Sequence, residues 1–248
     1  MSEESSEPLA EPHEFRAQIL AAYPDDFARF RHVLATLEHA IGSQESVQLS
    51  TELHRAMDMI MLQAYKSLCS VYVLVVRAHF EDAATICRRL MELAAQAGYI
   101  VEIEEDAEQN RRAGGYLASL WEAAPPQLKD ALPADYRAAW EKYHRDHQHL
   151  LKGKWRTWRP SFKEIFSRLD KSDVYDEDYA FLSGITHGSP PNLIFDYRGP
   201  VVQVRPHRHV PIMLKFSSRY GLAIMTLWNQ LFAAIEVDRL DELVRANS

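Results

Sequence analysis

Apolar residues recur every three or four positions over long stretches of the chain, as is typical of helices that are buried on one face. Residues 25–42 carry this spacing, and a helix expected over residues 50–80 becomes apolar on all sides in its second half, SVYVLVV. Asp82 is expected to cap another long helix, DAATICRRLMELAAQAGYIVEIE. Because the joint between these two helices is short, we expect an antiparallel pair at the centre of a bundle.

The remaining pattern predicts further helices and one departure from them. Additional helices are expected near residues 12–23, 133–151, 160–169, 176–186 and 211–244, and one irregular helix is expected between residues 102 and 126. In NLIFDYRGPVVQVRPH the apolar residues alternate on both sides of an Arg-Gly-Pro turn, which is typical of a β-hairpin. The predicted fold class is therefore all-α, a multi-helix bundle with one small β-hairpin near 193–205. The residues expected in its core are Leu68, Val73, Leu90, Leu93, Leu227 and Leu231.

Composition and charge narrow the class of protein. Residues 1–11 are rich in Ser, Glu and Pro and are expected to be disordered, which leaves residues 12–248 as a single helical domain. The net charge of −7 excludes a nucleic-acid clamp that is basic overall. Cys69 and Cys87 stand in apolar helical sequence, which favours reduced core thiols over a disulfide. No signal peptide or apolar run of about 20 residues is visible, so we expect a cytoplasmic protein without a membrane partner.

The helix expected from residue 82 carries two adjacent arginines and a glutamate. Glu92 stands four positions after Arg88 and three after Arg89, so it can meet either arginine on one helix face. This set can be a surface ion pair, or one guanidinium can point inward and hold a phosphate or a carboxylate. The helical phase places Arg89 nearer the buried stripe than Arg88.

A second candidate group stands at the end of the helix expected over residues 176–186. Tyr179, Ser183 and His187 follow one another at intervals of four, so all three can line one face. Gly188 after the histidine is typical of a helix C-terminus, where His187 could simply cap free carbonyls. Alternatively His187 is a general acid or base, since imidazole titrates near neutral pH. We expect this helix to meet the helix of residues 82–101. The contact should bring Ser183 and His187 into one hydrogen-bonded cluster with Glu92 and one of the two arginines.

Two further sets of residues have binding chemistry. His144 and His147 share a helix face and could ligate a metal, but no Glu-x-x-His pair recurs, and a solvated histidine-rich helix end with no metal is expected. The stretch from 142 to 171 is basic, with interleaved tryptophans that suit phosphates and stacked bases, although it could equally be a solvated face. Its candidate binding residues are Lys154, Trp155, Arg156 and Trp158.

Three segments carry a family resemblance. HFEDAATICRRLMELAAQAGYIVE, DYAFLSGITHGSP and WRTWRPSFKEIF resemble a bacterial family of unknown function that is all-helical and sometimes linked to defence. The resemblance covers residues 50–240 and implies a helical bundle akin to HEPN nucleases and nucleotide-binding bundles, without implying a known reaction. The usual HEPN motif is an arginine followed by a polar residue and then a histidine, with four to six residues between the arginine and the histidine, and it fits poorly. Arg137 and His144 have Ala138 in the polar position, and His149 follows Arg145 one position early.

Two functional hypotheses remain open. In the first, the protein is a toxin- or defence-type enzyme that cleaves RNA or a nucleotide without a metal, with His187 as acid or base, Arg89 holding phosphate and Glu92 orienting it. In the second, it is a non-catalytic module that binds a nucleotide, a nucleic acid or a protein. Neither requires a cofactor, and a homodimer is compatible with both. The sequence lacks Walker, Rossmann and CxxC motifs, which argues against ATPases, dehydrogenases and zinc ribbons.

Overall fold

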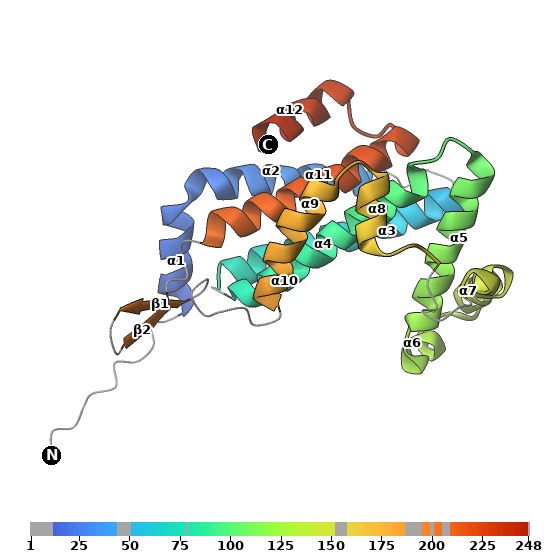
Figure 1. Cartoon of the computed structure of the whole chain (residues 1–248), viewed down its shortest axis with the longest axis horizontal. Coiled ribbons are helices and arrows are strands. Elements are labelled where there is room, and N and C mark those ends of the chain that lie inside the picture. Colours follow the sequence, from blue (N-terminus) through green and yellow to red (C-terminus); the bar gives the residue numbers. More distant parts are fainter. Residues whose placement is uncertain are drawn as a thin grey trace, which may run out of the picture.

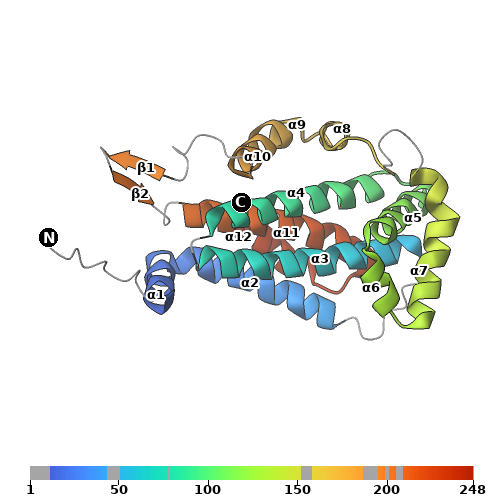
Figure 2. The same cartoon turned by 90° about the horizontal axis from the view of Figure 1, so that it is seen from below.

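Three long helices pack against one another at the centre of the protein. In the computed structural model they are α3 (Glu52–Val75), α4 (Phe80–Val101) and α11 (Val210–Phe232), with α2 (Pro24–Gly42) packed on α11 and α3 (Figures 1 and 2). The structure describes residues 12–43, 51–77, 79–151, 158–186, 195–198, 201–204 and 209–247. The fold is an all-α bundle, as the apolar periodicity predicts.

Shorter helices surround this centre on two sides. On one side of α4 lie α8 (Phe162–Arg168), α9 (Ser172–Val174), the π-helical turn η2 (Tyr175–Tyr179) and α10 (Ala180–Thr186). At one end of the bundle stand α5 (Asp106–Ala123), α6 (Pro126–Ala131), α7 (Ala134–His147) and the 3-10 turn η1 (Gln148–Leu151) (Figure 2). The first helix is α1 (Pro12–Ala22), and the last is α12 (Val237–Asn247).

Two short segments pair as antiparallel strands, β1 (Phe195–Arg198) and β2 (Val201–Val204). In their register Phe195 lies opposite Val204, and Arg198 lies opposite Val201. Both strands fall within residues 193–205, and the two residues between them lie outside the described part of the chain.

The expected last helix is wrong as a single element. Residues 211–244 divide into α11 and α12 because Ala233 adopts the left-handed conformation, with φ of 48°. The side chain of Asn229 secures the break: its amide donates to the carbonyl of Ile235 (2.9 Å) and its oxygen accepts from the N–H of the same residue (2.8 Å). A side chain that replaces helical hydrogen bonds in this way lets α12 fold back over the bundle.

The core prediction is confirmed for three residues and wrong for one. Leu68, Leu90 and Leu93 are buried, whereas Leu227 and Leu231 are partly buried against the core. Val73 is 45% exposed, although Val71 and Val75 are fully buried. Two positions correspond to about 200° around an α-helix, so Val73 faces away from both neighbours. An apolar run on all sides of a helix therefore does not mean burial on all sides.

The two cysteines lie on the apolar helices α3 and α4. Cys69 and Cys87 are both free, and Cys87 is fully buried, which raises the pKa of its thiol to about 12. A thiol with so high a pKa is an inert core residue rather than a nucleophile.

None of the helices in the described ranges has the length and apolar run that crossing a bilayer requires.

Candidate anion-binding site

A pocket of about 550 Å³ lies where α4 faces α3, α5 and the chain between Trp158 and Thr186. We call it the arginine pocket. Helix α4 is amphipathic: Leu90 and other residues on its apolar face enter the core, while its polar side chains line the pocket. The charged side chains in the lining are Arg88, Arg89, Glu92 and Arg159.

Arg88 is the more deeply placed arginine of the adjacent pair. Its Nε donates to Glu92 Oε1 (3.2 Å) and its Nη2 donates to Tyr179 Oη (2.6 Å), while the guanidinium lies over the Tyr179 ring at 4.7 Å from the centroid. The Arg88 side chain is 22% exposed, whereas Arg89 is exposed. The phase argument that placed Arg89 nearer the core is therefore wrong, because α10 and η2 cover the Arg88 side of α4.

Arg89 extends toward α3 and meets only neutral partners. Its Nη2 donates to Gln63 Oε1 (3.1 Å), and Gln63 Nε2 donates to Tyr116 Oη (2.8 Å) on α5. Burial raises the pKa of the Tyr116 hydroxyl well above its usual range, so the phenol stays neutral. Within the described residues no carboxylate forms an ion pair with Arg89, and Arg89 contributes its positive charge to the pocket lining.

Arg159 supplies a third guanidinium from the opposite wall. It donates to the carbonyl of Pro160 (3.0 Å) and lies over the Phe162 ring at 3.7 Å. Burial lowers its pKa from the usual arginine value, and the nearby Glu92 partly offsets this effect. A half-buried guanidinium loses part of its hydration, and an anion in the pocket would stabilise it.

An aromatic wall completes the pocket beside these charges. Trp158 packs between Tyr99 (5.8 Å between ring centroids) and Tyr116 (5.7 Å). The lining thus combines three arginines, one glutamate and aromatic surface, and its remaining members are neutral: Gln63, Thr85, Leu93, Gln96, Tyr116, Ser119, Leu120, Ala123, Trp158 and Thr186. Such a lining favours a planar, negatively charged ligand.

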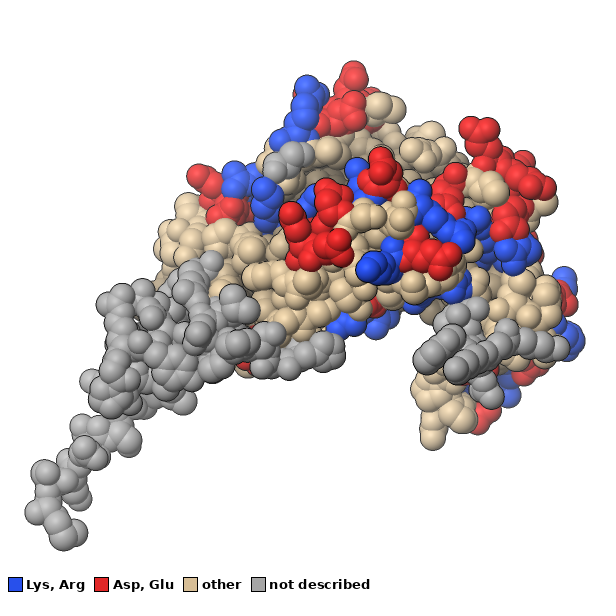
Figure 3. Space-filling view, in the orientation of Figure 1, with Lys and Arg blue, Asp and Glu red and all other residues tan. Residues whose placement is uncertain are grey.

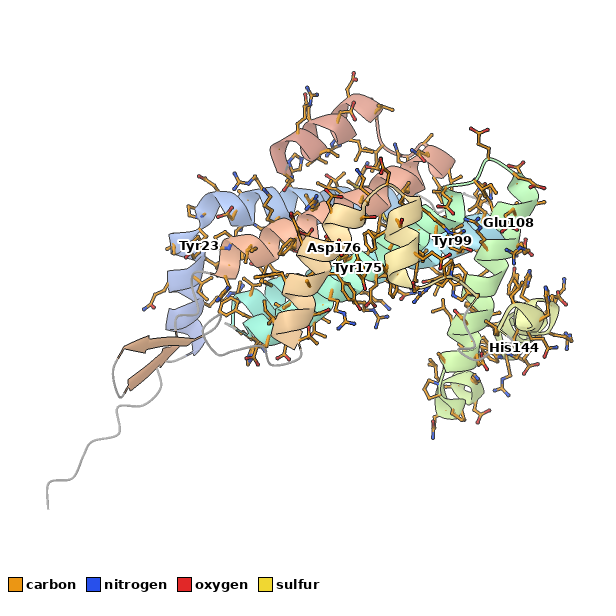
Figure 4. The ribbon with its side chains drawn as sticks, viewed as in Figure 1. Tyr23, Tyr99, Glu108, His144, Tyr175 and Asp176 are labelled. Carbon is orange, nitrogen blue, oxygen red and sulfur yellow. The ribbon has the colours of Figure 1, made fainter. Side chains whose placement is uncertain are left out.

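Tyr179 is held in place by the residue before it. Asp178 is 8% exposed and accepts hydrogen bonds from Tyr220 Oη and from Arg219 Nη1 (2.9 Å), both on α11. Burial and the neighbouring Asp178 raise the pKa of Tyr220 far above its ordinary value. Within the π-helical turn Asp178 therefore faces α11 while Tyr179 faces Arg88, and Figure 4 labels the adjacent Tyr175 and Asp176. Single π-helical turns are frequent at functional sites.

Some of the other predicted site residues lie in the described part of the chain, and the rest lie outside it. Helix α10 packs against α4 as expected, and Thr186 at its end lines the pocket. Ser183 does not line it, and the expected hydrogen-bonded cluster is wrong for this residue, because its buried Oγ has no hydrogen-bond partner in the part of the chain that the structure describes. His187, Lys154, Trp155 and Arg156 lie outside the described residues.

His144 and His147 lie on α7, where Figure 4 labels His144, and neither lines the arginine pocket. The Nδ1 of His147 lies 3.1 Å from the carbonyl of Tyr143, and its ring lies against Gly114 so closely that a Cβ there would overlap it. His147 is thus a packing residue between α7 and α5. In the described ranges no three His, Cys, Asp or Glu side chains are placed to hold a metal ion.

Sequence reasoning missed three polar residues of this region. Gln63 and Tyr116 connect Arg89 to α3 and α5, and Asp178 anchors the π-helical turn. Gln63 precedes Arg89 by 26 positions and Tyr116 by 53, so no local spacing relates them. The acidic Asp178 beside Tyr179 was a visible signal, but its partners on α11 are more than 40 positions away.

Comparisons with known proteins add one match. The sequence model of a family described as "Family of unknown function (DUF5677)" matches residues 59–198, a range that contains every described residue of the arginine pocket. This match agrees with the expected resemblance to an uncharacterised family, and it shows no relation to HEPN proteins. No curated protein and no solved structure matches the chain.

Proposed function

The chain belongs to this family of unknown function, and we propose from its own geometry that it binds a nucleotide or a closely similar phosphorylated molecule in the arginine pocket. The observation that carries the proposal is the charge of the lining, with three arginines against one glutamate. That glutamate, Glu92, is already hydrogen-bonded to Arg88. The pocket therefore presents a net positive charge to whatever enters it.

The hydrogen-bond donors of the arginines suit phosphate better than a single positive charge without that geometry would. A guanidinium offers a planar fork of N–H donors that matches the oxygens of phosphate in pairs. Arg89 uses one donor on a neutral amide and Arg159 uses one on a carbonyl, so donors remain for a ligand. The volume of about 550 Å³ lies within the range of small-ligand sites. Trp158 supplies an aromatic surface next to these donors, where a base can lie.

Removal of either donor should weaken nucleotide binding. We expect Arg89→Gln and Arg159→Gln each to raise the dissociation constant for ATP or GTP about ten- to a hundredfold, the effect of losing a hydrogen bond to a charged group. Isothermal titration calorimetry would measure this, with AMP and pyrophosphate separating the base from the phosphates. The matched control is Arg245→Gln on α12, an exposed arginine that bonds only a backbone carbonyl. An equal loss in the control, or no binding of any nucleotide by the unmodified protein, would contradict the proposal.

A catalytic version is favoured by one observation: Thr186, the residue directly before His187, lines the pocket. In this version Arg89 holds the phosphate, Glu92 orients Arg88 beside it, and His187 transfers a proton at the bond that breaks. Lys154, Trp155 and Arg156, which precede Trp158 in the chain, would extend the site along an RNA. Ser183 would support the helix that carries His187.

His187→Ala separates the catalytic protein from the binding module. If the protein cleaves nucleotides or short RNA, we expect this variant to lose cleavage by about a hundredfold or more while the melting temperature and nucleotide affinity stay unchanged. Cleavage followed by chromatography, together with thermal unfolding, provides both readouts. The control is His149→Ala, at an exposed residue of the turn η1. Unchanged cleavage in His187→Ala would remove its role as acid or base.

A further inference from the structure

A second, larger pocket of about 940 Å³ lies where α4 and α11 meet the segment from Phe166 to Val174 and the last helix, α12. We call it the α12 pocket. In Figure 1 it belongs to the region where α12 folds back over α11 beside α8 and α9. Its lining shares no residue with the arginine pocket. What occupies it is therefore a separate question from the proposed nucleotide site.

The walls of the α12 pocket are apolar. Ala94 and Gly98 come from α4, Leu222 and Ala223 from α11, and Val244 from α12. Val244 is 38% exposed and Ala223 is exposed, so the part of the wall that they form is open to water, whereas Leu222 and Gly98 lie buried behind it. An apolar surface of this kind is stabilised when a hydrocarbon covers it.

The charged side chains of the pocket are all cationic. They are Lys171, Lys215 and Arg219, and the lining contains no Asp or Glu. Arg219 is paired with Asp178, whereas Lys171 and Lys215 are exposed and have no ion-pair partner in the described ranges. In a chain of net charge −7, an exclusively positive lining is a local exception. Figure 3 shows acidic and basic side chains mixed over the face that it draws.

We propose that the α12 pocket binds a fatty acid, with the hydrocarbon chain against Leu222, Ala223 and Val244 and the carboxylate between Lys171 and Lys215. The combination of hydrocarbon walls with unpaired ammonium groups is complementary to an anionic amphiphile. A neutral apolar ligand would leave the lysines unused, and a small polar anion would leave the walls uncovered. The volume of the pocket is at the upper end of small-ligand sites, as a long acyl chain requires.

Chain length and head group give two independent tests of this assignment. Octanoate, decanoate and dodecanoate, titrated calorimetrically below their micelle concentrations, should bind with affinity rising by up to roughly fourfold per methylene. Decan-1-ol should bind about tenfold more weakly than decanoate because it lacks the charge that the lysines recognise. An affinity independent of chain length, or equal binding of the alcohol and the acid, would overturn the proposal.

Two variants place the binding in this pocket. Ala223→Trp fills it and should lower decanoate affinity at least tenfold, while Ala138→Trp, at an exposed alanine of α7, should not. If Ala223→Trp fails to fold, the double variant Lys171→Glu with Lys215→Glu serves instead, with Lys142→Glu and Lys163→Glu as its charge-matched control. Decanoate affinity should fall about tenfold in the first double variant only.

The same variants identify the competing occupant. A second copy of the chain could cover the apolar walls, and light scattering would then show a concentration-dependent dimer that Ala223→Trp dissolves. That result, together with no calorimetric signal for decanoate, would overturn the fatty-acid assignment and leave the nucleotide proposal untouched. Nucleotide affinity should be unchanged in every α12-pocket variant, because the two linings are separate.

Discussion

Arg112→Ala should lower the free energy of unfolding by about 3–5 kcal/mol, the range observed when one partner is removed from a buried ion pair. The Arg112 side chain is 7% exposed. Its Nη1 donates to the carbonyl of Tyr99 and to Glu102 Oε1 (2.6 Å), its Nε donates to Glu108 Oε1 (3.0 Å), and the guanidinium lies over the Tyr99 ring at 4.1 Å. Removing it leaves the Glu102 carboxylate and the Tyr99 carbonyl without this donor, while Glu108 keeps its ion pair with Arg111.

The contacts of Arg112 connect the end of α4 to the start of α5, where Figure 4 labels Tyr99 and Glu108. Tyr99 packs on Trp158, so this connection also supports the aromatic wall of the arginine pocket. We therefore expect Arg112→Ala to weaken nucleotide binding as well as folding. Equilibrium unfolding in urea, with the same slope for both proteins, measures the change in stability.

The neighbouring arginine provides the control for this experiment. Arg111 pairs with the same Glu108 and, with Arg112, holds the pKa of that carboxyl down at about 2. Its side chain is 45% exposed, and exposed ion pairs stabilise proteins by about 0–1 kcal/mol. Arg111→Ala should therefore cost far less than Arg112→Ala. Equal losses in the two variants would show that burial is not what makes Arg112 important.

Leu68→Ala should lower the free energy of unfolding by about 2–5 kcal/mol, because it opens a cavity at the centre of the bundle. Leu68 is fully buried on α3. It packs against the backbone of α11 at Gly221, where an added Cβ would lie 2.9 Å from Leu68 Cδ1. A packing so close leaves α11 little freedom to shift into the space that the alanine vacates.

Val73→Ala is the matched control on the same helix. Val73 is 45% exposed, so its truncation should change stability by less than about 1 kcal/mol. Chemical denaturation of both variants at one pH gives the comparison. A loss at Val73 as large as that at Leu68 would mean that the outer side of α3 is covered by another part of the protein.

The arrangement of the central helices was predictable because apolar spacing is a local property of the chain. The spacing within 50–80 and 82–101 identified α3 and α4, and their short joint implied an antiparallel pair. The end of α11 was not predictable in the same way. No glycine or proline marks Ala233, and the break depends on the Asn229 side chain meeting Ile235 six positions later. A polar residue in an apolar helix gave no indication of which backbone groups it would bind.

The sequence predicted only those features of the site that depend on the spacing of residues within one helix. The spacing of Arg88 and Glu92 predicted the contact between them, whereas Tyr179 was singled out by its spacing to Ser183 and His187 and meets Arg88. The prediction of which arginine lies deeper was wrong, because the depth of each arginine depends on the helices that cover α4 rather than on α4 itself. Arg159 stood in the basic stretch, but only the fold brings it to the pocket that Arg89 enters.

The π-helical turn has a consequence for the length of the chain rather than for its composition. Such a turn holds one residue more than an α-helical turn, so the helix on either side of it keeps its direction despite the extra residue. Deleting Glu177 would therefore leave an α-helical turn, with Thr186 still directed at the pocket. Inside the turn the angle between neighbouring side chains would change, so Asp178 and Tyr179 would approach α11 and Arg88 in altered directions. The exposed Glu177 thus tolerates a changed side chain better than its removal.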